Sequence, residues 1–214
     1  MKALLVGASP TAGSTRLALT MAADTDLLIA VDGGAQVCLE AGLTPDVLLG
    51  DFDSVSAATL DTLAVRGSAV IAFSAEKDET DLELAFAEAV RRGADSVTLT
   101  AVSGGRIDHQ LGVIAVLRAN AELAVRIVEP GFEAWLLSGT GPHSVVVQGE
   151  GRVLSLLPLT ATANVSARGV RWPLDRRELT DRETRGVSNV AVAGAAEVDV
   201  HSGTVLVVST PKLA

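Results

Sequence analysis

The stretch LLIAVDGGAQVCLEAGLTPDVLLGDFDS, residues 27–54, alternates two apolar runs with a helix-like segment. The runs 27–31 and 47–50 are short, apolar and bounded by turn residues, which is typical of buried strands. Residues 35–41 between them are expected to be helical and to end at Gly42. Because a strand, a helix and a strand in this order favour a crossover connection, the stretch predicts parallel pairing in a layered α/β fold.

The same alternation extends over the first 130 residues. Further strands are expected at 2–8, 69–73, 97–102 and 125–128, and further helices at 14–23, 56–66, 80–92 and 108–119. The helix at 80–92 has the clearest pattern, with apolar residues at helical spacing and Gly93 after it. We therefore predict that residues 1–130 form an α/β domain with a mostly parallel sheet.

The pattern changes near residue 130. Short strand-like runs follow at 144–148, 153–157, 164–167, 190–193, 198–201 and 204–209. Ser202 and Gly203, between the last two runs, predict a hairpin. Residues 138–214 are therefore expected to form a small antiparallel β-sandwich domain. The charged segment 171–185 predicts a solvated loop or a short helix, with a functional loop as the alternative.

The composition argues against several classes of protein. Of the 214 residues, 48% are hydrophobic, and no apolar run approaches the roughly 18 residues of a membrane helix. The net charge of −9 argues against nucleic acid as a partner, because phosphate backbones bind basic faces. The single cysteine, Cys38, excludes a disulfide within the chain and a multi-cysteine zinc site. The short apolar start predicts a first strand rather than a signal peptide, so we expect a cytoplasmic enzyme.

Acidic residues follow the ends of the predicted strands. The ends are Asp32-Gly33-Gly34, Gly50-Asp51-Phe52-Asp53-Ser54 and Ser103-Gly104-Gly105-Arg106-Ile107-Asp108-His109, and residues 76–81 open the helix at 80–92. Because the carboxyl ends of parallel strands share one edge of the sheet, these clusters are expected to converge there. The carboxylates are Asp32, Asp51, Asp53, Asp78, Asp81 and Asp108, and the counter-charges are Lys77 and Arg106.

Such a cluster of carboxylates repels itself unless a cation binds. Hard oxygen ligands favour Mg²⁺ or Ca²⁺, and Mg²⁺ commonly bridges one or two carboxylates to substrate phosphates, as phosphoryl transfer requires. The paired glycines allow the backbone to approach a phosphate, Arg106 suits a bidentate contact, and Lys77 supplies a point charge. Simpler explanations exist for single residues: Asp78 and Asp81 also favour a helix N-terminus, and His109 is also a plausible helix-start residue.

Two other motifs point to different proteins. The segment 7–15 resembles a phosphate-binding loop but lacks its Gly-Lys-Ser/Thr ending. The segment 51–55 resembles the nucleophile motif of the haloacid-dehalogenase phosphatases, in which the first Asp forms an aspartyl-phosphate. That family does not explain the clusters at 77–81 and 104–109. A third alternative is a protein that binds nucleotide or another small ligand for regulation, without catalysis, although the intact set of carboxylates argues against it.

Taken in order, the motifs resemble the thiamine pyrophosphokinase family over almost the whole chain. The matching pieces are Asp32-Gly33-Gly34-Ala35, 50–54, 77–83 and 104–109 in the first half, and 155–159, 169–174 and 186–189 in the second. The sequence departs from the family near Val113, where Asn is usual, and at Val190, where Glu is usual. The resemblance implies an α/β domain followed by a β-sandwich, in agreement with the break near residue 130.

The resemblance also implies a reaction and a set of site residues. The reaction is ATP plus thiamine to AMP plus thiamine diphosphate, with Mg²⁺, in a homodimer whose thiamine site is shared between subunits. The implied catalytic residues are Asp51, Asp53, Asp81, Arg106 and Asp108, of which Asp51, Asp53 and Asp81 would hold the metal. The residues implied to bind ATP are Asp32, Gly33, Gly34, Lys77, Asp78, Gly105 and His109.

For thiamine, the resemblance implies Trp172, Ser188 and Asn189. An indole is the best aromatic face for a cationic heterocycle, although Trp172 is alternatively a core residue of the sandwich. The same chemistry on another alcohol, such as a hydroxymethyl-pterin, is the nearest alternative function. The thiamine hydroxyl is expected to attack the β-phosphorus of ATP in line, with Asp108, Asp81 or no residue as the base.

Overall fold

The computed structural model describes residues 1–9 and 11–211, and the chain divides into two compact units. The first unit comprises Met1–Val116 and Val128–Pro130, and the second comprises Leu117–Ile127 and the chain from Gly131 onward. The strand β6 (Ala124–Glu129) contributes residues to both units. Among the described residues, no helix is both long and apolar enough to cross a membrane.

The first unit is built on a parallel sheet. Its strands are β1 (Lys2–Val6), β2 (Leu27–Val31), β3 (Val47–Gly50), β4 (Ala69–Ala72) and β5 (Ser96–Thr100). They lie in the order β5-β1-β2-β3-β4, and every pair of neighbours is parallel. The strands β2 and β3 are buried along their whole length, which explains why both are continuous apolar runs.

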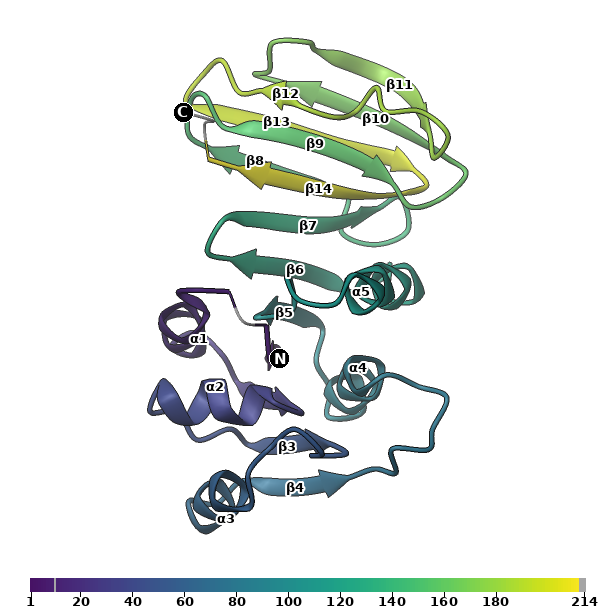
Figure 1. The fold of residues 1–214 in the computed structure, drawn as a ribbon. Coiled ribbons are helices and arrows are strands. Elements are labelled where there is room, and N and C mark those ends of the chain that lie inside the picture. Colours follow the sequence, from purple (N-terminus) through teal and green to yellow (C-terminus); the bar gives the residue numbers. More distant parts are fainter. Residues whose placement is uncertain (10, 212–214) are drawn as a thin grey trace. The chain divides into compact units, whose positions relative to one another are not determined.

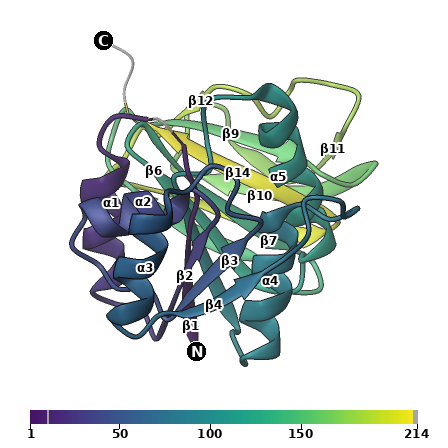
Figure 2. The same ribbon diagram turned by 60° about the horizontal axis from the view of Figure 1, so that its bottom comes forward.

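Helices cover both faces of this sheet. They are α1 (Ser14–Ala22), α2 (Gly34–Glu40), α3 (Ala57–Val65), α4 (Asp81–Arg91) and α5 (Ile107–Ala119). Figures 1 and 2 show α1, α2 and α3 on one face and α4 on the other. Beneath α1, α2 and α3, apolar residues of the helices pack against β1, β2 and β3, with Ala18, Cys38 and Leu63 fully buried. The predicted layered α/β fold is confirmed.

Two of these helices begin at side-chain caps close to where the sequence predicts their starts. The Ser56 hydroxyl accepts a hydrogen bond from the Thr59 N–H at the start of α3. The Thr80 hydroxyl likewise accepts from the Glu83 N–H at the start of α4, whose first turn carries Asp81. Because such caps fix where a helix starts, Thr80 determines where the Asp81 carboxylate emerges.

The second unit consists of antiparallel strands. They are β7 (Phe132–Ser138), β8 (Ser144–Gln148), β9 (Val153–Pro158), β10 (Thr162–Arg168), β11 (Leu174–Thr180), β12 (Asn189–Val190), β13 (Ala195–Ser202) and β14 (Thr204–Thr210). One sheet has the order β12-β9-β14-β7 and the other β11-β10-β13-β8. Alternate residues of both sheets form one apolar core, including Leu156, Val165 and Val198. The predicted antiparallel second part is confirmed.

Two expectations about this unit are wrong. The runs around Ser202 and Gly203 do not form a hairpin: β13 pairs with β10 and β8, whereas β14 pairs with β7 and β9. The chain passes from one sheet to the other at Gly203, whose φ is +75° and whose added Cβ would lie 2.4 Å from the Thr162 carbonyl oxygen. This close approach requires glycine for packing between sheets rather than for a hairpin turn.

The charged segment 171–185 contains a strand rather than only a loop or a short helix. The strand β11 pairs antiparallel with β10, and most of its side chains are exposed. The sequence of β11 lacks the apolar alternation by which strands are usually identified, and its backbone hydrogen bonds to β10 make it a strand. The structure also adds β7, which the sequence pattern did not predict, and shortens the expected strand at 190–193 to β12.

Candidate active site

A group of carboxylates lies just past the ends of β2 and β3. Asp32 follows β2 directly, and Asp51 and Asp53 follow β3. One oxygen atom of each carboxylate lies within 4.8 Å of the other two. Asp32 Oδ2 accepts a hydrogen bond of 2.7 Å from the Ser54 hydroxyl, whereas its buried Oδ1 has no hydrogen-bond partner among the described residues. The group therefore presents clustered oxygen ligands, one of them unsatisfied.

The backbone here adopts conformations that bring the two strand ends together. Asp32 and Phe52 have φ angles of +45° and +58°, which are uncommon for residues other than glycine. Phe52 packs against the apolar cluster beneath α1, α2 and α3, so its ring anchors the turn between the flanking carboxylates. At Gly50, an added Cβ would lie 3.0 Å from Asp32 Cα, so a larger residue would push the strand ends apart.

Lys77 lies between two carboxylates. Its Nζ is 3.1 Å from Asp81 Oδ1 and 3.7 Å from Asp51 Oδ2, and its side chain is only 13% exposed. Partial burial works to lower the pKa of Lys77, but hydrogen bonding and charge from Asp81 and Asp51 outweigh it and raise the pKa. Partial burial raises the pKa of Asp81, and the charges of Asp51 and Asp32 add to that rise against the opposing effect of Lys77. Lys77 thus neutralises only part of the negative charge.

Arg106 and Asp108 form an ion pair at the start of α5. Arg106 Nε donates to Asp108 Oδ1 at 3.1 Å, and Nη2 donates to Oδ2 at 2.5 Å. The hydrogen bond from Arg106 is the main cause that lowers the pKa of Asp108 to about 2, and the backbone N–H of His109 contributes. Both side chains are largely exposed, at 72% and 59%. Arg106 can therefore exchange Asp108 for another anion at low cost.

A cavity of about 540 Å³ in the first unit joins parts of this set. Residues from the ends of β1, β2 and β5 and from the starts of α4 and α5 line it. The predicted residues in its lining are Asp32, Asp81, Gly105, Arg106, Asp108 and His109. The predicted residues outside its lining are Gly33, Gly34, Asp51, Asp53, Lys77 and Asp78. Asp78 is exposed and makes no hydrogen bond or ion pair with any residue that the structure describes.

The two glycine pairs have different structural origins. An added Cβ at Gly34 would lie 1.9 Å from the Val6 carbonyl oxygen, and one at Gly33 would lie 2.8 Å from Ala8 Cβ. The packing of α2 against the end of β1 therefore accounts for this pair. Gly104 and Gly105 instead have φ angles of +93° and +70°, so the loop after β5 needs glycine for its backbone path.

The segment 7–15 supports the loop after β5. Ser9 N–H donates to the Ala101 carbonyl oxygen at 2.8 Å, and the Ser9 hydroxyl donates to the Ser103 carbonyl oxygen. The Thr11 hydroxyl donates to the same oxygen at 3.1 Å. Pro10, inside the segment, lies outside the described residues. The sequence carries one signal for this contact, the small hydroxyl residues after Gly7. The interpretation of that signal as a resemblance to a phosphate-binding loop does not predict hydrogen bonds to the loop after β5.

In the second unit, Trp172 and Asn189 are directly linked. Asn189 is buried, and its side-chain amide binds the backbone N–H and C=O of Trp172. Trp172 as a whole remains 56% exposed, so it is not a core residue of the sandwich. Ser188 has a φ of +63°, and its N–H donates to the Ser155 hydroxyl at 3.1 Å. The structure thus brings the three residues predicted for thiamine together around β12.

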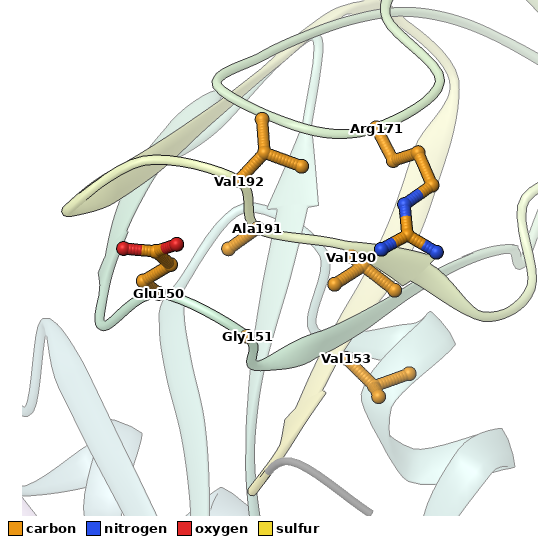
Figure 3. Close-up of a pocket in the computed structure, with 7 residues that line it drawn as sticks. All are labelled: Glu150, Gly151, Val153, Arg171, Val190, Ala191 and Val192. Carbon is orange, nitrogen blue, oxygen red and sulfur yellow. The ribbon is translucent and has the colours of Figure 1, made fainter.

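A second cavity, of about 640 Å³, lies beside this element within the second unit. Its lining consists of Glu150, Gly151, Val153, Arg171, Val190, Ala191 and Val192, and Figure 3 shows Glu150 and Arg171 on opposite sides of it. The Arg171 guanidinium also lies 5.6 Å from the centre of the Trp172 ring. Arg171 lies in the segment 169–174 that resembles the family, but it is not one of the residues predicted for the site.

Comparison with protein families gives two matches in chain order. Residues 19–128 match the family described as thiamin pyrophosphokinase, catalytic domain, and residues 143–205 match thiamin pyrophosphokinase, vitamin B1 binding domain. The chain is 26% identical over 185 residues to the thiamine pyrophosphokinase of Bacillus subtilis, covering 85% of this chain and 86% of that protein. It is 27% identical to thiamine pyrophosphokinase 2 of Arabidopsis thaliana, covering 78% of this chain and 66% of the relative.

Solved structures agree with this likeness. The crystal structure of the Bacillus subtilis thiamine pyrophosphokinase superposes with a TM-score of 0.84 at 24% identity, and each chain is covered completely. The thiamin pyrophosphokinase of Geobacillus thermodenitrificans gives a TM-score of 0.80 at 25% identity, covering 100% of this chain and 99% of that chain. The fold described above is therefore shared over the whole length of these bacterial proteins.

Proposed function

This chain belongs to the thiamin pyrophosphokinase family, and we propose on that premise that it transfers the pyrophosphoryl group of ATP to thiamine. The products are thiamine diphosphate and AMP. The observation that carries the proposal is the match of both family domains, catalytic and vitamin B1 binding, in order along one chain. The carboxylate group at the ends of β2 and β3 adds independent chemical support.

The two parts of the chain have separate roles in this proposal. Residues 1–130 bind ATP and the metal, because they contain the clustered carboxylates and the cavity next to them. Residues 138–214 bind thiamine, because they contain the exposed aromatic face of Trp172. The functional unit is a homodimer with a shared thiamine site, a feature that rests on the resemblance to the family alone.

The donor set fits Mg²⁺. Asp32, Asp51 and Asp53 offer hard oxygen ligands close together, and Asp32 Oδ1 is buried without a partner in the described chain. We propose that Asp51 and Asp53 hold the ion with Asp32, and that Asp81 completes the set from the first turn of α4. When bound, the ion neutralises charge on the triphosphate.

The remaining residues around the cavity handle ATP. The Arg106 guanidinium moves away from Asp108 and binds two phosphate oxygens of ATP. The exchange is possible because the Arg106–Asp108 ion pair is exposed. Lys77 provides a positive charge beside Asp51 and Asp81. Gly105 and His109 line the same cavity and contribute backbone and ring contacts to the nucleotide. Gly33 and Gly34 keep the start of α2 against β1, which fixes the position of Asp32, and exposed Asp78 lies beside the set.

The chemical step is an in-line displacement. The hydroxyl oxygen of thiamine forms a bond to the β-phosphorus of ATP while the bond from that phosphorus to the α,β-bridging oxygen breaks, and the bridging oxygen leaves on AMP with the electron pair. Asp108 and Asp81 are the candidate acceptors for the hydroxyl proton, and a loose transition state requires neither of them.

Thiamine binding is assigned to the residues around β12. The half-exposed Trp172 ring presents an aromatic face to the cationic thiazolium. Ser188 supplies a hydroxyl from a backbone held at positive φ. Asn189 acts through Trp172, because both ends of its amide are already engaged with the Trp172 backbone.

The deciding experiment measures AMP formation from ATP and Mg²⁺ with and without thiamine, with chromatographic detection of thiamine diphosphate. AMP that depends on thiamine and matches thiamine diphosphate one to one supports the proposal. AMP release only with another alcohol, such as a hydroxymethyl-pterin, would retain the mechanism and change the substrate. Thiamine-independent phosphate release with a trapped phosphoenzyme would favour the phosphatase alternative, and tight binding without AMP a regulatory protein.

A further inference from the structure

We propose that Glu129 is a positioning residue that holds the glycine-containing loop after β5 in the shape needed to bind the phosphates of ATP. Glu129 is the last residue of β6, belongs to the first unit, and is only 5% exposed. It does not line the cavity of the first unit, so its effect reaches the nucleotide through the backbone of the loop. The nucleotide part of this proposal rests on the proposed function.

The contacts of Glu129 are concentrated on one point of the loop. Its Oε1 accepts hydrogen bonds from two successive backbone amides, those of Val102 at 2.8 Å and Ser103 at 3.0 Å. At the same residue of the loop, the Ser103 carbonyl oxygen accepts hydrogen bonds from the hydroxyls of Ser9 and Thr11. The peptide groups that start the loop are thus held on both sides by side chains from distant parts of the chain.

These amides need an acceptor from outside the sheet. The strand β5 ends at Thr100, and Ala101 then takes a φ of +55°, which turns the chain out of the strand. Amides beyond that point no longer pair with a neighbouring strand, and buried backbone amides are almost always hydrogen-bonded. A carboxylate that reaches in from β6 satisfies two of them at once.

A buried carboxylate is unfavourable unless hydrogen bonds or a nearby positive charge compensate for its burial. Burial raises the pKa of Glu129, although the backbone amides of Val102, Ser103 and Ala101 and the Ser103 side chain oppose the rise. Its Oε2 is buried and has no hydrogen-bond partner in the described part of the chain. The hydrogen bonds from the Val102 and Ser103 amides are therefore the contacts that fix this carboxylate, and they hold the start of the loop in place.

The loop leads directly into the proposed phosphate site. After Ser103 come Gly104 and Gly105, both at positive φ, and then Arg106. Val102, Gly104, Gly105 and Arg106 all line the cavity of about 540 Å³. Glycines impose little conformational restriction of their own, so a loop that contains them keeps one shape only if its ends are held. Glu129 and the Ser9–Thr11 hydroxyls provide that hold, which preorganises the site for its ligand.

The test compares Glu129→Ala with Glu129→Gln and a control, Thr100→Val, by amide hydrogen exchange and by ATP affinity in calorimetry. Thr100 is fully buried next to the loop, and its hydroxyl has no partner among the described residues, so its replacement removes no hydrogen bond. Loss of the acceptor in Glu129→Ala is expected to speed exchange at Val102 and Ser103 and to weaken ATP binding, each by about tenfold or more. Glu129→Gln keeps an acceptor oxygen and is expected to restore both, and Thr100→Val to change neither.

Kinetics separate positioning from general destabilisation. In Glu129→Ala, KM for ATP should rise while KM for thiamine stays at the wild-type value, a split that a merely less stable protein would not show. If Glu129→Ala does not fold, Glu129→Asp shortens the reach of the carboxylate and is expected to change exchange and ATP affinity in the same directions. Wild-type exchange and ATP affinity in the folded Ala or Asp variant would overturn the proposal.

The test of Glu129 can be interpreted whether or not the proposed function is correct. If the wild-type protein makes no AMP from ATP and thiamine, the proposed function fails, but exchange at Val102 and Ser103 and calorimetric ATP binding still decide the role of Glu129. If thiamine-dependent AMP appears but the loop is unaffected by Glu129→Ala, only the Glu129 proposal fails.

Discussion

The side chain of Asn189 binds the backbone of Trp172 at both of its polar groups. Asn189 Oδ1 accepts from the Trp172 N–H at 3.1 Å, and Asn189 Nδ2 donates to the Trp172 carbonyl oxygen at 2.8 Å. The two residues are 17 positions apart in sequence. The backbone of Trp172 is therefore fixed while the residue as a whole stays more than half exposed, which is the arrangement expected of an aromatic residue presented to a ligand.

Replacing Asn189 with Ala should raise KM for thiamine with little change in kcat. The variant loses both hydrogen bonds to the Trp172 backbone, and the ring no longer has a fixed position. The cost of leaving buried groups unpaired, about 1–3 kcal/mol, corresponds to a rise of roughly 5- to 150-fold. Steady-state kinetics with varied thiamine at saturating ATP measure the effect, and Trp172→Ala sets its upper limit.

A matched control for this variant is Asn164→Ala. Asn164 also uses its side-chain amide to bind a backbone carbonyl oxygen, that of Arg176 at 2.8 Å, but away from β12. It should leave KM for thiamine unchanged. An equal rise in both variants would show that general loosening of the second unit, and not the position of Trp172, controls thiamine binding.

Asp53→Asn should reduce turnover by orders of magnitude while the fold stays intact. Asp53 is one of three carboxylates whose oxygens lie within 4.8 Å of one another, and an amide is a poorer ligand for Mg²⁺ than a carboxylate. Turnover measured across a Mg²⁺ titration checks this, with Asp61→Asn on the exposed face of α3 as the control. Near-normal turnover of Asp53→Asn at low Mg²⁺ would contradict the metal assignment.

The stability of the first unit should depend on Glu88 in a pH-specific way. Glu88 accepts hydrogen bonds from Arg91 at 2.7 Å and from Arg92 at 2.6 Å, and pairing with Arg91 is the main cause that lowers its pKa from 4.5 to about 2. Since the folded pKa is below the unfolded value, the stabilisation is complete above about pH 4.5 and is lost as the pH falls toward 2.

Glu88→Gln should therefore lower Tm by several degrees at pH 7, and the difference from wild type should shrink as the pH falls from 4.5 toward 2. Thermal unfolding followed by circular dichroism across this range measures the effect. Glu122→Gln, at an exposed position, is the control and should match wild type at each pH. A constant difference for Glu88→Gln at all pH values would show that its role is packing alone.

Cys38 should be unreactive in the folded protein. It is fully buried in α2, and burial raises the pKa of its thiol to about 12, so almost no thiolate is present at pH 8. A thiol reagent such as Ellman's reagent should label no cysteine in the native protein and one equivalent after unfolding in denaturant. Rapid labelling of the native protein would contradict the packing of α2 against the sheet.

Much of the first unit was predictable from local patterns. The buried strands β2 and β3 are continuous apolar runs, and Ser56 and Thr80 are side-chain caps at the expected helix starts. The carboxylates of Asp32, Asp51 and Asp53 could be placed together because parallel strands end at one edge of a sheet. These features depend on residues close in sequence or on a general rule of topology.

The features that sequence reasoning missed depend on contacts between distant residues. The strand β11 has few buried side chains, so its hydrogen bonds to β10, and not its own composition, make it a strand. Gly203 indicated a hairpin, but the pairing of β13 and β14 with other strands assigns them to different sheets. The ion pairs of Lys77 with Asp51 and Asp81 likewise required a fold in which the end of β3 and the start of α4 meet.

The sequence by itself determined the fold class, the strand ends that carry carboxylates and the family to which the chain belongs, because apolar periodicity, capping residues and short motifs are local properties. The tertiary structure alone decided which side chains are held by structural partners: Lys77 by Asp51, Asn189 by the Trp172 backbone, and Glu129 by the amides of Val102 and Ser103. Burial, hydrogen bonding and charge pairing depend on distances across the folded chain, and those distances exist only once the strands have paired.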